Sequence, residues 1–236
     1  MKIFRVEDFF DLKKCGFRDL YEGVEQVWEA IGRIKPYIEK RLKELGPGCH
    51  GKMIGKPWIG EDGYIGEGTV VEEGAMIKGP TVIGRNCEIR HGAYIRGFAL
   101  IDDRVVIGNS TEVKNAAIHQ EALLPHFNYA GDSIIGWRVH LGGGCGLANL
   151  KLNWEMVKVK SNEEKIATGL KKFGAIIGDY CDMGGDTILN PGTLVGPRSI
   201  IYANTVFGGY LAPESIVKAR VLHEIVKRDM GKGLPR

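Results

Sequence analysis

Aliphatic side chains recur at every sixth residue through the middle of the chain. A period of six matches neither the 3.6-residue repeat of a helix nor the two-residue alternation of a half-buried strand. It predicts short strands separated by sharp bends, stacked so that an aliphatic ladder fills the interior, with glycine where the backbone must turn. Counted from Met53, the ladder runs through Ile59, Ile65, Val71, Ile77, Ile83, Ile89, Ile95, Ile101, Ile107 and Val113, and glycine follows directly at Gly60, Gly66, Gly84 and Gly108.

The six-residue register slips twice after Val113 and then resumes. Its later positions are Ile118, Leu124 and Ala130, then Ile135, Leu141 and Leu147, and finally Ile177, Met183, Leu189, Val195, Ile201 and Phe207. Residues 150–174 lack the register, and within them MVKVK alternates like a strand before the turn-forming NEE and the return KIATGLKKF. The pattern predicts an all-β solenoid over residues 51–218 with an inserted loop, which is either surface decoration or a lip over a ligand site.

A helical pattern precedes the solenoid. Its apolar positions, spaced by three and four, are Leu20, Val24, Val27, Ile31, Ile34, Ile38, Leu42 and Leu45. We expect Pro36 to kink or split this helix and Gly46-Pro47 to end it. The N-terminal region, residues 1–50, is predicted to be a helical cap on the open end of the solenoid, with an oligomer-forming helix as the alternative. The basic tail, residues 219–236, either frays or covers the last coil.

Composition narrows the class of protein. The 236 residues fit one domain with appendages, and 32 Lys+Arg against 29 Asp+Glu is too even to indicate a nucleic-acid surface. The opening MKIFRVEDFFDL lacks the apolar core of a secretory signal, and no apolar run approaches membrane-spanning length. The five cysteines include no CxxC motif, which argues against a disulfide framework and a Cys-rich zinc site. We therefore expect a soluble cytoplasmic protein with reduced thiols.

The run GNSTEVKNAAIHQEALLPHFNYAGDSIIGWRVHLGGG covers the register slips. Together with the repeat, it resembles the hexapeptide-repeat acyltransferases, in particular the acetyltransferase half of the bifunctional glucosamine-1-phosphate N-acetyltransferase/UDP-N-acetylglucosamine pyrophosphorylases. The segment NLKLNW to FGAIIGD resembles the lengthened loop of their sugar-1-phosphate nucleotidyltransferase/acetyltransferase subgroup. The resemblance implies a left-handed parallel β-helix and a homotrimer with sites between neighbouring helices. It also implies acetyl-CoA as co-substrate, an amino-sugar phosphate as acceptor in UDP-N-acetylglucosamine biosynthesis, and no metal requirement.

The resemblance also assigns catalytic positions. The family's catalytic histidine falls on His126, and an imidazole is suited to taking the proton that a sugar amine must lose before it attacks a thioester. Glu112 is expected to orient that imidazole or to favour its protonated form. Asn149 or backbone N–H groups between Leu141 and Gly144 are candidates to stabilise the oxyanion.

Substrate and cofactor positions follow the same resemblance. The sugar phosphate is expected to lie among basic side chains and a phenol, namely Arg96, Lys114, Lys172 and Tyr129. The positions associated with coenzyme A are Gly143, Gly185, Ala203 and Arg220. This sequence departs from the family pattern in carrying His140 for a sugar-contacting asparagine, Leu150 for a tyrosine, Gly143 for an alanine and Gly185 for a serine. These departures bear on the identity of the amino sugar and of the acyl group.

Two other classes compete with an acyltransferase. Hexapeptide β-helices include zinc carbonic anhydrases, which need three histidines with a His-x4-His pair, whereas His119, His126 and His140 are seven and fourteen residues apart. Such β-helices also occur as non-catalytic scaffolds or regulatory subunits, which the matched polar positions disfavour. Nothing before the repeat resembles the Gly-x-Gly-Thr-Arg loop of a pyrophosphorylase. We therefore expect no pyrophosphorylase activity and a separate nucleotidyltransferase acting with this protein.

Overall fold

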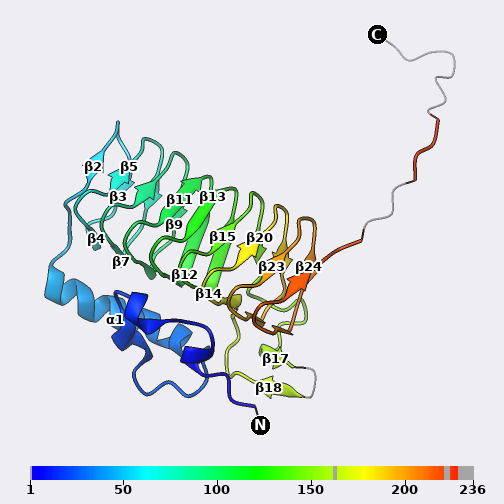
Figure 1. Cartoon of the computed structure of the whole chain (residues 1–236). Helices are drawn as coiled ribbons and strands as arrows, with labels where there is room; N and C mark the ends of the chain where they lie inside the picture. Colours follow the sequence, from blue (N-terminus) through cyan, green and yellow to red (C-terminus); the bar gives the residue numbers. More distant parts are fainter. Residues whose placement is uncertain (1, 162–163, 221–223, 228–236) are drawn as a thin grey trace.

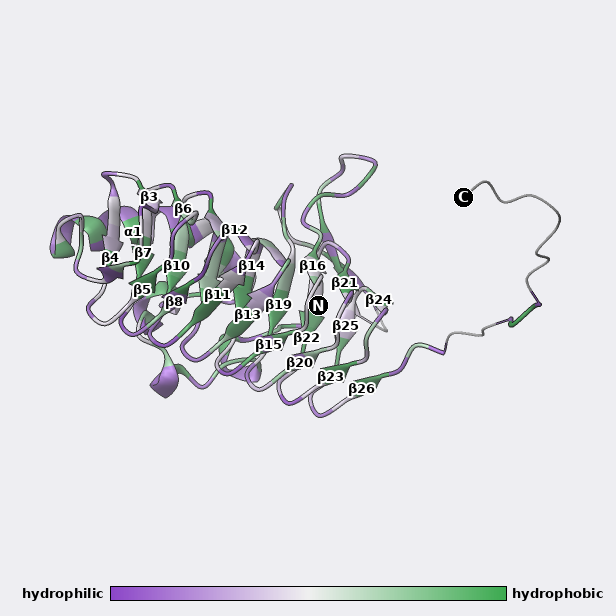
Figure 2. Ribbon diagram, turned by 90° about the horizontal axis from the view of Figure 1, so that it is seen from above, coloured by the Kyte–Doolittle hydropathy of each residue, from purple (hydrophilic) through white to green (hydrophobic). Residues whose placement is uncertain are grey.

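The computed structural model describes residues 2–161, 164–220 and 224–227. Short parallel strands wind around three faces of a solenoid, and the coils stack along one axis (Figure 1). The architecture is the predicted left-handed parallel β-helix with an N-terminal helical cap. Hydrophobic residues concentrate on the strands, while the bends between them are mostly polar (Figure 2).

The three faces are built from strands that repeat once per coil. The cap face consists of β1 (Gly48–Cys49), β4 (Gly63–Ile65), β7 (Thr81–Ile83), β10 (Ala99–Ile101), the C-terminal parts of β12 (Glu112–Ile118) and β14 (Tyr129–Ile135), β19 (Ala175–Ile177), β22 (Thr193–Val195) and β25 (Tyr210–Leu211). The nine-stranded face consists of β2 (Lys52–Met53), β5 (Val70–Val71), β8 (Glu88–Ile89), β11 (Val106–Asn109), β13 (Leu123–His126), β15 (His140–Leu141), β20 (Asp182–Met183), β23 (Ile200–Ile201) and β26 (Ile216–Val217). The third face consists of β3 (Trp58–Ile59), β6 (Met76–Ile77), β9 (Tyr94–Ile95), the N-terminal parts of β12 and β14, β16 (Gly146–Leu147), β21 (Ile188–Leu189) and β24 (Val206–Phe207).

The aliphatic ladder is confirmed as the interior of the solenoid. Every predicted position from Ile65 to Ile201 is buried in one continuous core, and Ile59 and Phe207 pack against its two ends. Burying an isoleucine side chain stabilises a fold by about 1.5–3 kcal/mol, so the ladder is the main source of stability of the coils. Met53, at the edge of the first coil, is 54% exposed.

Each of the two register slips shortens one coil by one residue. Val113 pairs with Ile95 18 residues earlier but with Ala130 only 17 residues later. With one residue fewer, β12 and β14 each run without a break from the third face onto the cap face. These two long strands pair along six positions and place the polar residues of the slipped segment side by side.

Glycine follows the ladder residues because adjacent coils approach closely there. A Cβ atom at Gly66 would lie 2.6 Å from the carbonyl oxygen of Gly84, and one at Gly108 would lie 1.8 Å from that of Pro125. The expectation that these glycines provide the sharp turn is wrong, because neither adopts a positive φ. The left-handed residues come later in each coil, and many are not glycine, such as Asn86 and Arg104 with φ of 54° and 59°.

The N-terminal segment covers the cap face. It consists of three short 3-10 helices, η1 (Val6–Asp8), η2 (Leu12–Lys14) and η3 (Arg18–Tyr21), followed by α1 (Glu29–Leu45). α1 lies along β4, β7, β10, β12 and β14, so the cap runs beside the coils rather than across their open end (Figure 1).

Two details of the predicted helix need correction. Leu20 to Val27 precede α1, since Gly23 adopts a φ of 65° and interrupts the helical pattern. Pro36 does not split the helix, which continues through it to Leu45. As predicted, the helix ends at Gly46.

The insertion folds as a hairpin beside the cap. β17 (Lys158–Lys160) and β18 (Lys165–Ala167) are antiparallel, and the predicted turn between them falls largely on residues 162–163, outside the described residues. Val157, Val159, Ile166 and Phe173 are buried in the same apolar cluster as the N-terminal segment. Of the predicted tail, residues 224–227 are exposed, and most of the remainder lies outside the described residues.

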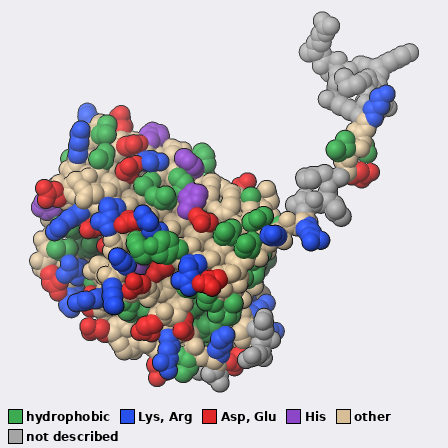
Figure 3. Space-filling model, in the orientation of Figure 1, with side chains coloured by type: hydrophobic (Ala, Val, Ile, Leu, Met, Phe, Trp, Pro, Cys, Tyr) green, Lys and Arg blue, Asp and Glu red, His purple; other side chains and the backbone are tan. Residues whose placement is uncertain are grey.

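The surface charges, the cysteines and the helices can be compared with what the composition predicted. Acidic and basic side chains are interspersed over the nine-stranded side of the molecule (Figure 3). Within the described residues, the five cysteines form no disulfide, and four of them are buried. No helix in the described ranges has both the length and the apolar character needed to cross a bilayer.

Candidate functional site

Four of the predicted substrate and catalytic residues come together on the third face. Arg96 follows β9 and lies beside Lys114 of β12, because its backbone N–H bonds to the carbonyl of Val113. Glu112 and Tyr129 are direct partners in the pairing of β12 with β14. All four side chains project outward, because they alternate along the strands with ladder residues that point inward.

Glu112 binds Arg96 rather than His126. The Arg96 Nη1 donates a hydrogen bond of 2.7 Å to the Glu112 Oε1, and this bond raises the pKa of the guanidinium. The expected contact of Glu112 with the imidazole is not formed, because Glu112 projects from the third face while His126 lies at the corner that precedes it. Glu112 therefore orients a cation of the cluster in this structure.

A buried carboxylate that sequence reasoning missed connects this cluster. Asp132, with a side chain only 7% exposed, lies 3.4 Å from the Lys114 Nζ and accepts a 2.8 Å hydrogen bond from Asn115. The Asn149 side chain donates to Asp132 and, at 3.1 Å, to the Tyr129 hydroxyl. The sequence feature that could have revealed it is an aspartate between Gly131 and Ser133, in a strand whose neighbouring residues are small or apolar.

The phenol of Tyr129 keeps its proton at neutral pH. Its pKa is raised above the ordinary value, first by burial and then by the negative charges of Asp132 and Glu112. A protonated phenol can donate a hydrogen bond to an anionic ligand. Both donated bonds of Asn149 come from its single Nδ2, which leaves that amide without a further donor for an oxyanion.

His126 lies at the corner between the nine-stranded and third faces. It ends β13, its side chain is exposed, and its backbone carbonyl accepts from the N–H of Gly144 at 3.2 Å. The register places Gly143, Gly185 and Ala203 at the same corner of the three following coils. This corner therefore presents a track without bulky side chains beginning next to the imidazole.

The backbone N–H of Gly143 is free to bind a ligand. Across the described residues it donates no hydrogen bond, whereas the N–H groups of Gly142 and Gly144 bond to Met183 and His126. An atom added at the Gly143 Cβ position would lie 3.8 Å from the Cβ of His126, so the glycine leaves space beside the histidine.

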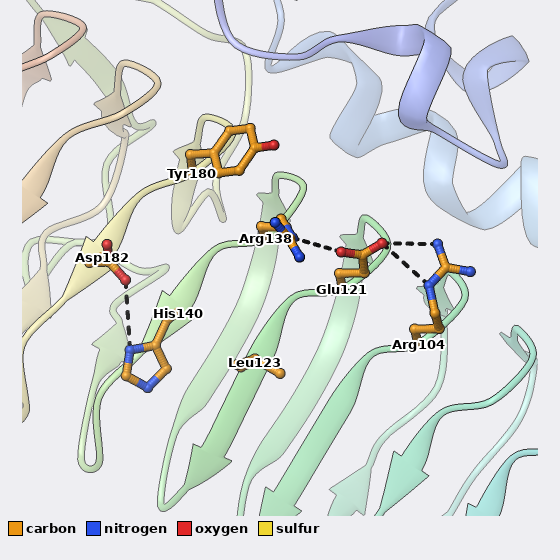
Figure 4. A pocket seen from close by; sticks show the side chains of 7 residues that line it. All are labelled: Arg104, Glu121, Leu123, Arg138, His140, Tyr180 and Asp182. Atoms are coloured by element: carbon orange, nitrogen blue, oxygen red, sulfur yellow. Dashed lines mark hydrogen bonds and ion pairs between the residues drawn. The ribbon is translucent and has the colours of Figure 1, made fainter.

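His140 lies apart from this cluster, on the nine-stranded face. It lines an open pocket of about 670 Å³ together with Arg104, Glu121, Leu123, Arg138, Tyr180 and Asp182 (Figure 4). Its Nδ1 is 3.8 Å from the Asp182 Oδ1. In the same pocket both arginines point toward Glu121 and donate hydrogen bonds to its carboxylate. Burial opposes ionisation of this carboxyl, but the hydrogen bonds from Arg138 and Arg104 hold its pKa below the ordinary value.

Two predicted residues are exposed and make no described polar side-chain contact. Lys172 lies at the end of the insertion, where the N–H of Phe173 bonds to the carbonyl of Asn149 and that of Gly174 to the carbonyl of Asp132. The insertion thus returns to the cluster at Lys172. Arg220 follows β26, and the described structure does not bring it into contact with the corner track.

The three histidines of the zinc alternative lie in separate places. His119 is fully buried under the cap, where its Nε2 is 2.6 Å from the Tyr21 hydroxyl and its ring packs on Phe10 and Phe17. Burial lowers its pKa to about 3. Since His126 is at an exposed corner and His140 on an outer face, these three side chains do not form one metal site, and no group of three His, Cys, Asp or Glu suited to a metal occurs among the described residues.

Comparison with known proteins decides the family. The uncharacterized acetyltransferase YaiX of Escherichia coli is 34% identical over 191 residues, which are 78% of this chain and 83% of that protein. This chain belongs to the hexapeptide-repeat acyltransferase family. The family described as the GMPPB C-terminal domain also matches this acyltransferase, at residues 77–171.

Two bifunctional relatives match the acyltransferase over part of their length. A bifunctional sugar-1-phosphate nucleotidylyltransferase/acetyltransferase of Sulfurisphaera tokodaii is 36% identical over 155 residues, 66% of this chain and 37% of that protein. A bifunctional GlmU protein of Methanococcus vannielii is 38% identical over 108 residues, 46% of this chain and 26% of that protein. The acyltransferase chain therefore spans well under half the length of these relatives.

Proposed function

We propose that this protein is an acyl-CoA-dependent N-acetyltransferase that acts on an amino-sugar phosphate resembling glucosamine 1-phosphate. The supporting observation is the cluster on the third face, in which Arg96, Lys114 and Tyr129 project together close to the corner that carries His126. A phosphate needs cations and hydrogen-bond donors, and acyl transfer to an amine needs a base nearby. Membership of the acyltransferase family and the bifunctional relatives point the same way.

His126 is the proposed general base. The sugar ammonium first releases one proton to solvent, and its neutral nitrogen then attacks the thioester carbon, forming the N–C bond and a tetrahedral oxyanion. The imidazole accepts the proton that the nitrogen releases. Collapse of the intermediate breaks the C–S bond, and the proton passes to the coenzyme A thiolate. The products are an amide and free thiol.

Phosphate binding is assigned to Arg96, Lys114, Tyr129 and Lys172. The side chains of Arg96 and Lys114 are 42% and 27% exposed, so both can reach a ligand while paired with Glu112 and Asp132. The guanidinium suits bidentate contact with phosphate oxygens, and the lysines supply point charges. The role of Glu112 in this proposal is to hold Arg96.

The oxyanion donor is assigned to the backbone N–H of Gly143 rather than to Asn149. The Asn149 amide already donates to Asp132 and Tyr129, whereas the Gly143 N–H is free beside His126. Fixed donors of this kind stabilise the charge that develops during acyl transfer. The pantetheine arm of coenzyme A then follows the track of Gly143, Gly185 and Ala203, with Arg220 toward its phosphates.

A homotrimer completes the proposed site. The cluster and the track lie on the outside of a single solenoid, while His140 occupies another face. Packing the nine-stranded face of one subunit against the third face of another brings His140 to the substrate. The reaction is placed in the cytoplasm, where acyl-CoA is made, and its product would be consumed by a separate nucleotidyltransferase.

A thiol-release assay tests the function. The purified protein is mixed with acetyl-CoA or longer acyl-CoAs and with amino-sugar 1-phosphates or the same sugars without phosphate. We expect thiol release that depends on both partners and prefers the phosphorylated acceptor. Binding of neither substrate, with no thiol release from any pair, would reject the enzyme and favour the scaffold alternative.

A further inference from the structure

Asp132 is a buried charge at the centre of the candidate site. Its carboxylate is surrounded by the Lys114 ammonium and the Asn115 and Asn149 amides, which come from the neighbouring coils. Its backbone is in the left-handed region with φ 48°, and its carbonyl accepts from the N–H of Gly174. Removing a carboxylate from water is unfavourable unless its oxygens are bonded, so these contacts hold it in one orientation.

The carboxylate determines the direction of the hydrogen bonds around it. An ionised aspartate only accepts, so it fixes the Asn149 amide with its nitrogen toward Asp132. The same nitrogen donates its second hydrogen to the Tyr129 oxygen at 3.1 Å. Because that oxygen is accepting, the hydrogen of the Tyr129 hydroxyl points elsewhere.

We infer that Asp132 is a positioning residue that, through Asn149, makes Tyr129 a hydrogen-bond donor to the phosphate of the acceptor. The inference rests on the proposed function, to which it adds the residue Asp132 and the direction of the hydrogen bond between Asn149 and Tyr129. The Lys114 ammonium also lies near this carboxylate, 3.4 Å away. Asp132 touches no substrate itself.

Asp132→Asn tests the direction of bonding with almost no change of shape. The new amide can donate to the Asn149 oxygen, which lets Asn149 turn and accept from Tyr129, so that the phenol proton points inward. We expect KM for the phosphorylated acceptor to rise about tenfold or more, the scale of a lost hydrogen bond to a charged group. KM for the unphosphorylated sugar should change little, so the preference for phosphate falls.

A double-mutant cycle separates positioning from general loss of structure. Tyr129→Phe removes the same donor, so we expect Asp132→Asn to add little to the loss of phosphate preference in the Tyr129→Phe background. Asn115→Ala is the matched control, since Asn115 binds the other carboxylate oxygen and has no bond to Asn149. It should retain the wild-type phosphate preference even if it lowers thermal stability.

The inference is overturned if folded Asp132→Asn keeps the phosphate preference, or if its effect multiplies with that of Tyr129→Phe. Should Asp132→Asn not fold, Asn149→Ala replaces it: removing the link must also lower the preference, and an unchanged preference contradicts the proposal. Wild-type acetylation of a phosphorylated amino sugar establishes the proposed function independently of these variants. Absence of that activity refutes the function itself.

Discussion

The exposed imidazole of His126 stands beside a corner where the next coils carry only glycine and alanine. His91 occupies the same corner two coils earlier, as the pairing of β11 with β8 and β13 shows, and is also exposed. The two residues therefore share a local backbone setting but differ in their neighbours, because only His126 adjoins Gly143 and the cluster of the third face.

This difference predicts unequal effects of removing the two imidazoles. His126→Ala should lower kcat by about 100-fold or more, the usual scale for loss of a general base, with coenzyme A binding retained. His91→Ala should behave like the wild type in the same assay. Steady-state kinetics with an acceptor that the wild type acetylates provide the measurement, and near-normal turnover of His126→Ala would refute the proposed base.

Removal of the cluster's cations should act on binding of the phosphate. Arg96→Ala and Lys114→Ala are each expected to raise KM for the phosphorylated acceptor by about tenfold or more, since contacts with charged groups contribute roughly 1.5–3 kcal/mol. Arg90→Ala is the matched control, because Arg90 forms a similar 2.6 Å pair with Glu88 away from the cluster. Equal changes with phosphorylated and unphosphorylated sugars would contradict the assignment.

At the scale of elements, the sequence predicted most of the coils because one requirement repeats along them. Each ladder residue, such as Ile77 or Ile135, must be aliphatic to fill the interior of the solenoid. This requirement can be read directly from the sequence, because it recurs at a fixed spacing. The path of α1 was not predictable in the same way. An apolar stripe indicates that a helix packs against something, but not whether it meets the open end or the outward side chains of Val82 and Leu100.

Long-range contacts explain what was missed at the site. Asp132 meets Asn149 across 17 residues and Lys114 across 18, because coil length puts those positions side by side. The resemblance placed Glu112 beside the catalytic base, whereas the side to which it projects follows from strand alternation and gives it Arg96 as partner. Residue identity indicated the chemistry, and the stacking of the coils determined which groups meet.

Docking of the N-terminal segment on β12 introduces a dependence on pH. His119 is fully buried against Tyr21, Phe10 and Phe17, and its folded-state pKa is about 3 because burial disfavours the charged ring. The unfolded chain binds that proton near pH 6.5. Above pH 6.5 His119 is neutral in both states and does not lower the free energy of unfolding. Between pH 6.5 and 3 the unfolded chain binds a proton at His119 that the folded protein does not, so the free energy of unfolding decreases as the pH falls.

Replacing this histidine should weaken the acid sensitivity of folding. From pH 7 to pH 5 the proton uptake accounts for about 2 kcal/mol of lost stability, and His119→Leu should lack that share of the decrease. Denaturant unfolding at the two pH values gives the comparison, with His91→Leu as an exposed control that keeps the wild-type slope. An unchanged pH dependence in folded His119→Leu would show that His119 does not contribute to it.

On the scale of the whole molecule, the proposed reaction needs groups that one solenoid keeps on separate faces. His126 and the Arg96 cluster border the third face, whereas His140 lies in the pocket of the nine-stranded face. We therefore predict a homotrimer with shared sites, and light scattering should report three times the 26.0 kDa chain mass. Complementation provides the sharper measurement: His126→Ala and His140→Ala, each less active alone, should regain activity when co-expressed as mixed trimers, because some interfaces then combine two intact half-sites. A stable monomer with full activity, or mixed trimers without any recovery, would show that each chain works alone.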